Sequence, residues 1–250
     1  MARARGVGGH AAVSPLPRAL LFDLDDTIVR ESAGAENLWG ELCDAFAARA
    51  GVEANALHAA VLAARDWFWD DPAREKRGRL AMPWARRAVA EEAFRRLGLR
   101  NLATAHALGD AFTRTRNERM DFFTGARETL LELRTRGHRL ALLTNGGAVF
   151  QREKIERFAL APLFDAILVE GELGFGKPDP RVFERALRAL AAEPQEALMT
   201  GNDLRSDVLG AKRAGIRSVW VDHARAGVPS GAPAQPDRVV HAIAELVSVG

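Results

Sequence analysis

Short apolar runs separated by longer amphipathic stretches recur along most of this chain. The short runs are typical of buried strands, and the stretches between them carry apolar residues at helical spacing. Strands that alternate with helices predict a parallel sheet with right-handed crossovers. We therefore expect an α/β protein with a Rossmann-like three-layer core. The expected strands are 19–22, 139–143, 166–169, 197–199, 218–221 and 238–240, and the expected helices are 125–136, 149–158, 181–190 and 207–214.

One long region breaks this alternation, because no convincing strand occurs between about residues 30 and 120. The region predicts an all-helical cap domain, 30–120, inserted into a discontinuous core made of 18–29 and 121–250. Within the cap, residues 70–79 are polar and interrupted by Pro72, so we expect a loop there. The expected cap helices are 38–50, 54–70, 83–97 and 102–120.

Charge and composition exclude several classes of protein. The net charge is only +2, and arginine is scattered rather than gathered on one face, so nucleic-acid binding is not expected. No apolar run is long enough to cross a membrane. Residues 1–17 lack the apolar centre of a secretory signal and predict a disordered tail. Cys43 is the only cysteine, which excludes an intrachain disulfide, suits a reducing cytoplasm and is expected to be buried.

Three carboxylates and a hydroxyl follow the first predicted strand directly. They are Asp23, Asp25, Asp26 and Thr27. Such residues are also common in helix caps and turns. Here, however, they stand at the edge of an α/β sheet where ligands bind, and clustered carboxylates repel one another unless a cation or a shared proton compensates. Asp23 and Asp25, two residues apart, point to the same side of an extended chain.

The segment DLDDT at 23–27 resembles the first motif of the haloacid dehalogenase-like hydrolase superfamily. Three further stretches resemble its later motifs in the same order, and the helical insert is similar to the branch with an all-helical cap. These stretches are 142–146, 176–180 and 201–211. The resemblance implies a magnesium-dependent phosphatase that acts on a small phosphorylated metabolite, a sugar phosphate or a nucleotide.

The same resemblance implies roles for individual residues. Asp23 would be the nucleophile and form an aspartyl-phosphate, and Asp25 would protonate the leaving group and then activate water. Lys177 would orient Asp23 and offset the charge of the phosphate. The phosphate oxygens would be held by Thr144, Asn145, Gly146 and Lys177.

The magnesium ligands implied by the resemblance are Asp23, Asp25, Asn202 and Asp207. The family places an aspartate directly after the glycine of the fourth motif, whereas this chain has Asn202. An amide oxygen can bind Mg²⁺ but brings no charge, which predicts weaker binding. Alternatively Asp203 reaches the ion. Asp207 acts through water, or is only a helix N-cap.

Other interpretations remain open at this point. A dehalogenase on the same fold needs neither a metal nor an acid at Asp25. A phosphomutase differs from a phosphatase only in the group that accepts the phosphoryl group. The loss of a negative charge at Asn202 is also compatible with a catalytically impaired binding module. The cap tryptophans are expected to be core residues, and Arg86 and Arg87 a solvated helix face. No histidines have metal-ligand spacing, and the oligomeric state is open.

Overall fold

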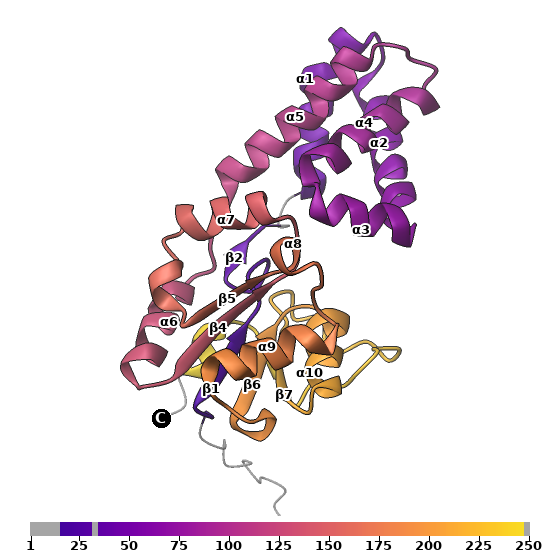
Figure 1. Ribbon diagram of the computed structural model, residues 1–250. Helices are drawn as coiled ribbons and strands as arrows, with labels where there is room; N and C mark the ends of the chain where they lie inside the picture. The colour runs from indigo at the N-terminus through magenta and orange to yellow at the C-terminus, as the bar shows by residue number, and fades with distance from the viewer. Residues whose placement is uncertain (1–15, 32–34, 248–250) are drawn as a thin grey trace, which may run out of the picture.

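The computed structural model describes residues 16–31 and 35–247, which form a layered α/β core with a helical bundle above one edge of its sheet (Figure 1). In this described part, six parallel strands form one sheet in the order β5-β4-β1-β6-β7-β8. The predicted parallel sheet is therefore confirmed. The strands are β1 (Ala19–Phe22), β4 (Arg139–Thr144), β5 (Ala166–Val169), β6 (Ala197–Gly201), β7 (Arg217–Val221) and β8 (Arg238–Val240).

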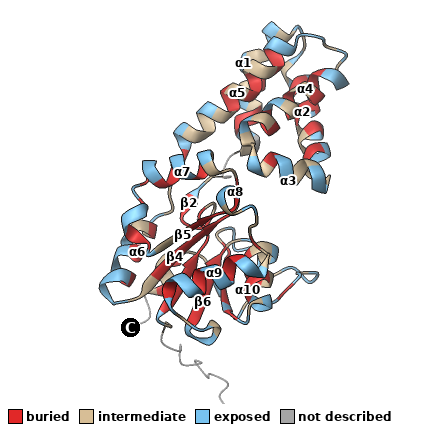
Figure 2. Cartoon of the chain, in the orientation of Figure 1, coloured by how far each residue is buried: buried red, intermediate tan, exposed pale blue. Residues whose placement is uncertain are grey.

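Helices cover both faces of this sheet, which gives the three predicted layers. Alternate residues of a strand point to opposite faces. Leu20 and Phe22 of β1 accordingly pack in one hydrophobic cluster with α6 and α7, and Ala19 and Leu21 pack in another with α9. The central strands are buried between them (Figure 2). The core helices are α6 (Ala126–Thr135), α7 (Ala148–Arg157), α8 (Glu170–Leu173), α9 (Pro180–Leu190) and α10 (Gly210–Arg213).

A two-stranded antiparallel ribbon, β2 (Val29–Arg30) with β3 (Asp121–Phe122), joins the core to the helical bundle. The sequence did not indicate these strands, because two residues are too few to show a period. Between them, in the described residues 35–119, five helices enclose a hydrophobic cluster of their own. They are α1 (Ala35–Ala50), α2 (Ala54–Trp69), α3 (Pro72–Leu80), α4 (Met82–Arg96) and α5 (Leu102–Arg119). We refer to this bundle as the cap.

The prediction of a loop over 70–79 is wrong, since α3 occupies Pro72–Leu80. Asp71 is its N-cap and accepts a hydrogen bond from the Arg74 N–H at 2.8 Å. Proline is well tolerated in the first turn of a helix, where its missing N–H would have no partner. Pro72 therefore starts a helix here instead of interrupting one.

The ends of the chain and its cysteine add little to the site. Residues 1–15 of the predicted tail lie outside the described residues, whereas Leu16 packs partly buried against the core. Cys43 is buried as expected, and burial, with Asp44 beside it, raises the pKa of its thiol to about 12. None of the described helices has the length and apolarity that a membrane crossing requires.

Candidate active site

Asp23 is the first residue after β1 and lies at the carboxyl edge of the sheet. Its N–H donates to the Thr200 carbonyl at 2.9 Å, which extends the pairing of β1 with β6 by one residue. The chain then turns sharply, because the N–H groups of Ile28 and Val29 both donate to the Leu24 carbonyl. This turn keeps the Asp23 carboxylate at the edge, where it is only 7% exposed.

Lys177 brings a buried positive charge to Asp23. Its Nζ lies 2.5 Å from Asp23 Oδ1 and 2.7 Å from Asp207 Oδ1. Burial works to lower the pKa of Lys177, but the two carboxylates outweigh it and raise that pKa, so the ammonium group stays charged. Burial also raises the pKa of Asp23 to about 6, against the attraction of Lys177. The sequence-predicted pair is thus in direct contact.

Asp25 is held by two side chains of α7 that the sequence analysis missed. Its Oδ1 accepts a hydrogen bond from Lys154 Nζ at 2.6 Å and its Oδ2 accepts one from Gln151 Nε2 at 2.8 Å. Burial, followed by repulsion from Glu31, raises the pKa of Asp25 to about 6 despite Lys154. One signal was available in the sequence: Gln151 and Lys154 occupy the same helix face as the apolar Ile155, where a buried polar residue requires a partner.

Three of the four predicted phosphate-binding residues lie where β4 ends, but not all of them are available to a ligand. Thr144 is buried at the end of β4. The Asn145 amide exchanges hydrogen bonds with the backbone of Lys177, donating to its carbonyl at 2.7 Å and accepting from its N–H at 2.8 Å. The Gly146 N–H donates to Glu170 Oε2 at 3.0 Å. Asn145 therefore fixes the Lys177 loop, and the Gly146 N–H is already engaged by the protein.

Oxygen atoms from two strand ends meet around Thr27. Its Oγ1 lies 3.1 Å from Asp23 Oδ2 and 3.3 Å from Asn202 Oδ1. Carboxylate and amide oxygens are ligands that suit Mg²⁺. In the described part of the chain, no group of three or more His, Cys, Asp and Glu side chains is placed to hold a metal ion. The donors gathered around Thr27 are a carboxylate oxygen of Asp23 and the amide oxygen of Asn202. The chemistry of this donor set fits a hard cation.

The two aspartates of the fourth motif, Asp203 and Asp207, have different roles in the structure. Asp207 is 1% exposed; Lys177 holds its Oδ1, and its Oδ2 accepts the Asp203 N–H at 2.9 Å. The interpretation of Asp207 as an N-cap is wrong, because the π-helical turn Leu204–Leu209 begins earlier than expected. Asp203 is the N-cap, and its Oδ1 accepts the N–H groups of the next turn.

The cap contacts the core at the loop that follows β4, beside this site. Arg79 of α3 makes a bidentate pair with Glu170, at 2.9 and 2.8 Å. The Gly147 N–H donates to the Arg79 carbonyl at 3.2 Å. A Cβ atom at Gly147 would lie 2.1 Å from the Leu80 carbonyl oxygen, so only glycine allows this close approach. The same Glu170 carboxylate thus joins the cap to the Gly146 backbone.

The prediction that Arg86 and Arg87 form a solvated helix face is correct for only one of the two residues. Arg87 is exposed and pairs with Asp110, but Arg86 is 3% exposed and its guanidinium lies 5.7 Å from the ring of Phe150 on α7. The two neighbours point in different directions because successive helical residues are about 100° apart. The core interpretation of the tryptophans holds for Trp39, which is buried and stacks on Phe112.

Comparison with known proteins identifies the family. A family model described as haloacid dehalogenase-like hydrolase matches residues 17–215. The chain belongs to this family. The match begins just before β1 and includes the cap and the ends of β4 and β6, so the resemblance seen in the four motifs is confirmed.

Individual relatives support the phosphatase branch of the haloacid dehalogenase-like hydrolases. A phosphoserine phosphatase of Thermus thermophilus is 36% identical over 247 residues, covering 92% of this chain and 97% of the relative. A glyceraldehyde 3-phosphate phosphatase of Pyrococcus abyssi is 41% identical over 101 residues, 40% of this chain and 42% of that protein. The crystal structure of a 2-haloacid dehalogenase of Pseudomonas syringae has a TM-score of 0.61 at 27% identity, covering 94% of this chain and 98% of that one. The predicted enzyme class, a phosphatase of this family, is confirmed.

Proposed function

We propose that this chain is a magnesium-dependent phosphatase that hydrolyses a small phosphorylated metabolite through an aspartyl-phosphate on Asp23. The observation that carries the proposal is a pair of carboxylates at the end of β1, each bonded to its own buried lysine. Asp23 contacts Lys177, and Asp25 contacts Lys154. Two such carboxylates, one attacking and one transferring protons, are what phosphoryl transfer through a covalent intermediate requires.

In the first step an Asp23 oxygen attacks phosphorus, and the bond from phosphorus to the leaving-group oxygen breaks. Lys177 holds the nucleophile in place and offsets the negative charge of the ester. Asp25, whose pKa is raised to about 6, keeps a useful protonated fraction near neutral pH and gives its proton to the leaving oxygen. Asp25 then accepts a proton from the water that attacks phosphorus and releases phosphate, which regenerates Asp23.

The oxygen donors beside Thr27 supply the proposed metal site. Asp23 and Asn202 would hold Mg²⁺ through their side chains and Asp25 through its carbonyl oxygen. Bound Mg²⁺ would neutralise part of the charge shared by the nucleophile and the phosphate oxygens. Because both Asp207 oxygens are engaged, Asp207 would act by holding Lys177 and the Asp203 backbone, and would reach a cation only through water.

The names of the two curated relatives favour a small metabolite, a phosphorylated amino acid or a sugar phosphate, over the nucleotide considered from the sequence. The likeness to a dehalogenase does not favour halide release, since that chemistry has no use for a proton donor at Asp25. A cytoplasmic location is part of the same proposal.

The test is release of phosphate from para-nitrophenyl phosphate with Mg²⁺ and after treatment with EDTA. We expect turnover only with Mg²⁺ and, after rapid acid quenching, a phosphoryl group on the peptide that contains Asp23. Asp23→Asn should abolish both, whereas Asp44→Asn, on an exposed part of α1, should retain both. Turnover by Asp23→Asn, or halide release from a haloacid without metal, would overturn the proposal.

A further inference from the structure

Arg86 is a buried cation whose hydrogen-bonding capacity is unused. Its side chain is 4% exposed, and its Nε, Nη1 and Nη2 atoms have no hydrogen-bond partner in the described structure. The Phe112 and Phe150 rings lie 5.3 and 5.7 Å from the guanidinium. The nearest carboxylate in an ion pair, that of Glu31, is 3.6 Å from Nη2, which is too far for a hydrogen bond. Buried N–H groups without a hydrogen-bond partner are costly, so an acceptor for the Arg86 guanidinium is expected.

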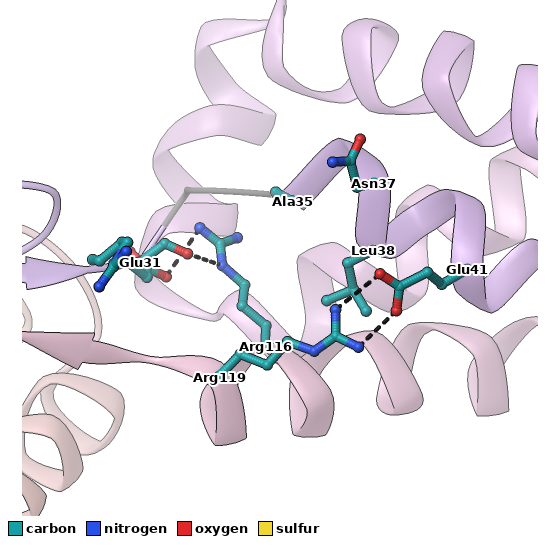
Figure 3. A pocket seen from close by; sticks show the side chains of 8 residues that line it. Glu31, Ala35, Asn37, Leu38, Glu41, Arg116 and Arg119 are labelled. Atoms are coloured by element: carbon teal, nitrogen blue, oxygen red, sulfur yellow. Dashed lines mark hydrogen bonds and ion pairs between the residues drawn. The ribbon is translucent and has the colours of Figure 1, made fainter. Parts of the chain in front are cut away.

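Arg86 lines a cavity of about 80 Å³ between the cap helices, which we call the arginine cavity. All of its charged lining residues are arginines, namely Arg65, Arg86 and Arg116, and the rest of its lining is apolar, with Trp39, Trp69 and Phe112 as the aromatic walls. Since a water molecule takes roughly 30 Å³ of liquid volume, this space suits one small oxyanion. The neighbouring pocket in Figure 3 differs, because Glu31 and Glu41 line it and pair with Arg116 and Arg119.

A series of charged contacts through Glu31 links Arg86 to the proposed active site. Lys154 Nζ lies 2.6 Å from Asp25 Oδ1 and 3.6 Å from Glu31 Oε2, and Glu31 Oε1 lies 3.6 Å from Arg86 Nη2. Arg116 also faces Glu31, donating from Nε to its carbonyl at 2.8 Å. The cluster of Asp25, Glu31, Lys154, Arg86 and Arg116 therefore contains three cations and two carboxylates. One positive charge is left for a ligand.

We propose that Arg86 and the arginine cavity bind a second anionic group of the substrate, a carboxylate or a second phosphate. The proposal rests on the proposed phosphatase function and narrows its substrate class. In the bound substrate the phosphorus would lie at Asp23, the leaving oxygen at Asp25, and the organic part would extend past Lys154 toward Arg86, along the contacts described above. Its distal oxyanion accepts the N–H groups that now have no partner, and the planar guanidinium fork matches a carboxylate or a phosphate.

The experiment measures kcat/KM with Mg²⁺ for pairs of esters that differ in the second anion. O-Phosphoserine is compared with O-phosphoethanolamine, which lacks only the carboxylate, and glucose 1,6-bisphosphate with glucose 6-phosphate. We expect wild type to prefer the anionic member of at least one pair by about tenfold or more, since a hydrogen bond to a charged group contributes on that scale. The pair that responds identifies the anion as carboxylate or phosphate.

Variants of Arg86 assign the preference to this side chain. Arg86→Met should reduce the preference by about tenfold or more, mainly through a higher KM for the anionic member. Arg87→Met, one position along α4 and facing solvent, is the matched control and should keep the wild-type preference. Arg86→Lys retains the charge without the fork and should be intermediate, and it decides the matter if Arg86→Met does not fold.

Two results would overturn the inference while leaving the phosphatase proposal intact. One is hydrolysis of para-nitrophenyl phosphate by wild type with no preference in either pair. The other is an equal loss on both members of a pair in Arg86→Met, or an unchanged preference in Arg86→Lys, which would mean that the guanidinium has only a structural role. If wild type hydrolyses none of these esters, the proposed function itself fails, and the inference fails with it.

Discussion

The Nζ atom of Lys154, buried on α7, lies 2.6 Å from Oδ1 of Asp25. The lysine also lies 3.6 Å from Glu31, so a single ammonium group faces both the proposed catalytic Asp25 and the neighbouring Glu31. Without it, Asp25, whose side chain is 21% exposed, would lie next to Asp23 and Glu31, and its side-chain hydrogen bonds to the described residues would be reduced to the one from Gln151. Lys154 is therefore a positioning residue for Asp25, and it influences how readily Asp25 holds a proton.

Lys154→Met should move the pH dependence of kcat/KM. The positive charge lowers the pKa of Asp25, so its removal lets that pKa rise above about 6. If protonated Asp25 gives its proton to the leaving group, the alkaline limb of the profile shifts upward, by about one pH unit for each 1.4 kcal/mol of lost interaction. The exposed Lys212→Met is the control and should leave the profile in place. An unshifted limb in Lys154→Met would count against Asp25 as the acid.

Asn202→Asp should tighten Mg²⁺ binding by about tenfold or more, because it adds a negative charge to the oxygen donors around Thr27. Isothermal titration with Mg²⁺ measures the affinity directly. Asp203→Asn is a suitable control, since asparagine is also a good N-cap and should preserve the turn at Leu204. Unchanged affinity in Asn202→Asp, with weaker binding in Asp203→Asn, would move the ligand role to Asp203.

The stability of the metal-free enzyme should fall as pH rises, in part because of Asp25. Its folded pKa of about 6 lies above the ordinary 3.8, so the contribution is fully present below pH 4 and is lost as pH rises through 6. Denaturant unfolding in EDTA should show that Asp25→Asn reduces the loss between pH 5 and pH 7.5 by roughly 1 kcal/mol. Asp44→Asn should behave as wild type. A loss that is the same in Asp25→Asn as in wild type would contradict the raised pKa.

The pair of Arg79 with Glu170 should couple the cap to the core. Glu170 is buried, so removing Arg79 leaves a carboxylate with less compensation. A double-mutant cycle of Arg79→Met and Glu170→Gln should give a coupling free energy of about 1–3 kcal/mol. The exposed pair of Arg87 with Asp110, also bidentate but within the cap, should give a clearly smaller coupling, because solvent screens both charges. Equal couplings would mean that the cap–core pair is no more than a surface contact.

Much of the site follows from short-range patterns in the sequence. The apolar run before Asp23 predicted a strand, and the strand places the carboxylate at the edge of the sheet. The motifs around Thr144, Lys177 and Asn202 were indicated because each follows a predicted strand or lies in the next loop, and the carboxyl ends of parallel strands share one edge. These features depend on a few consecutive residues, so the sequence alone could determine them.

The contacts between the cap and α7 had no such local signal. Nothing in the sequence distinguishes Arg86 from Arg87. Only the packing of α4 against α5 and α7 buries Arg86 and leaves Arg87 exposed. Lys154 likewise gained its role when α7 packed beside the turn after β1. Burial depends on which surfaces meet across long sequence separations, whereas periodicity records only which residues share a face. The sequence thus determined the strands and their catalytic motifs, and the tertiary structure decided which charged side chains are buried beside them.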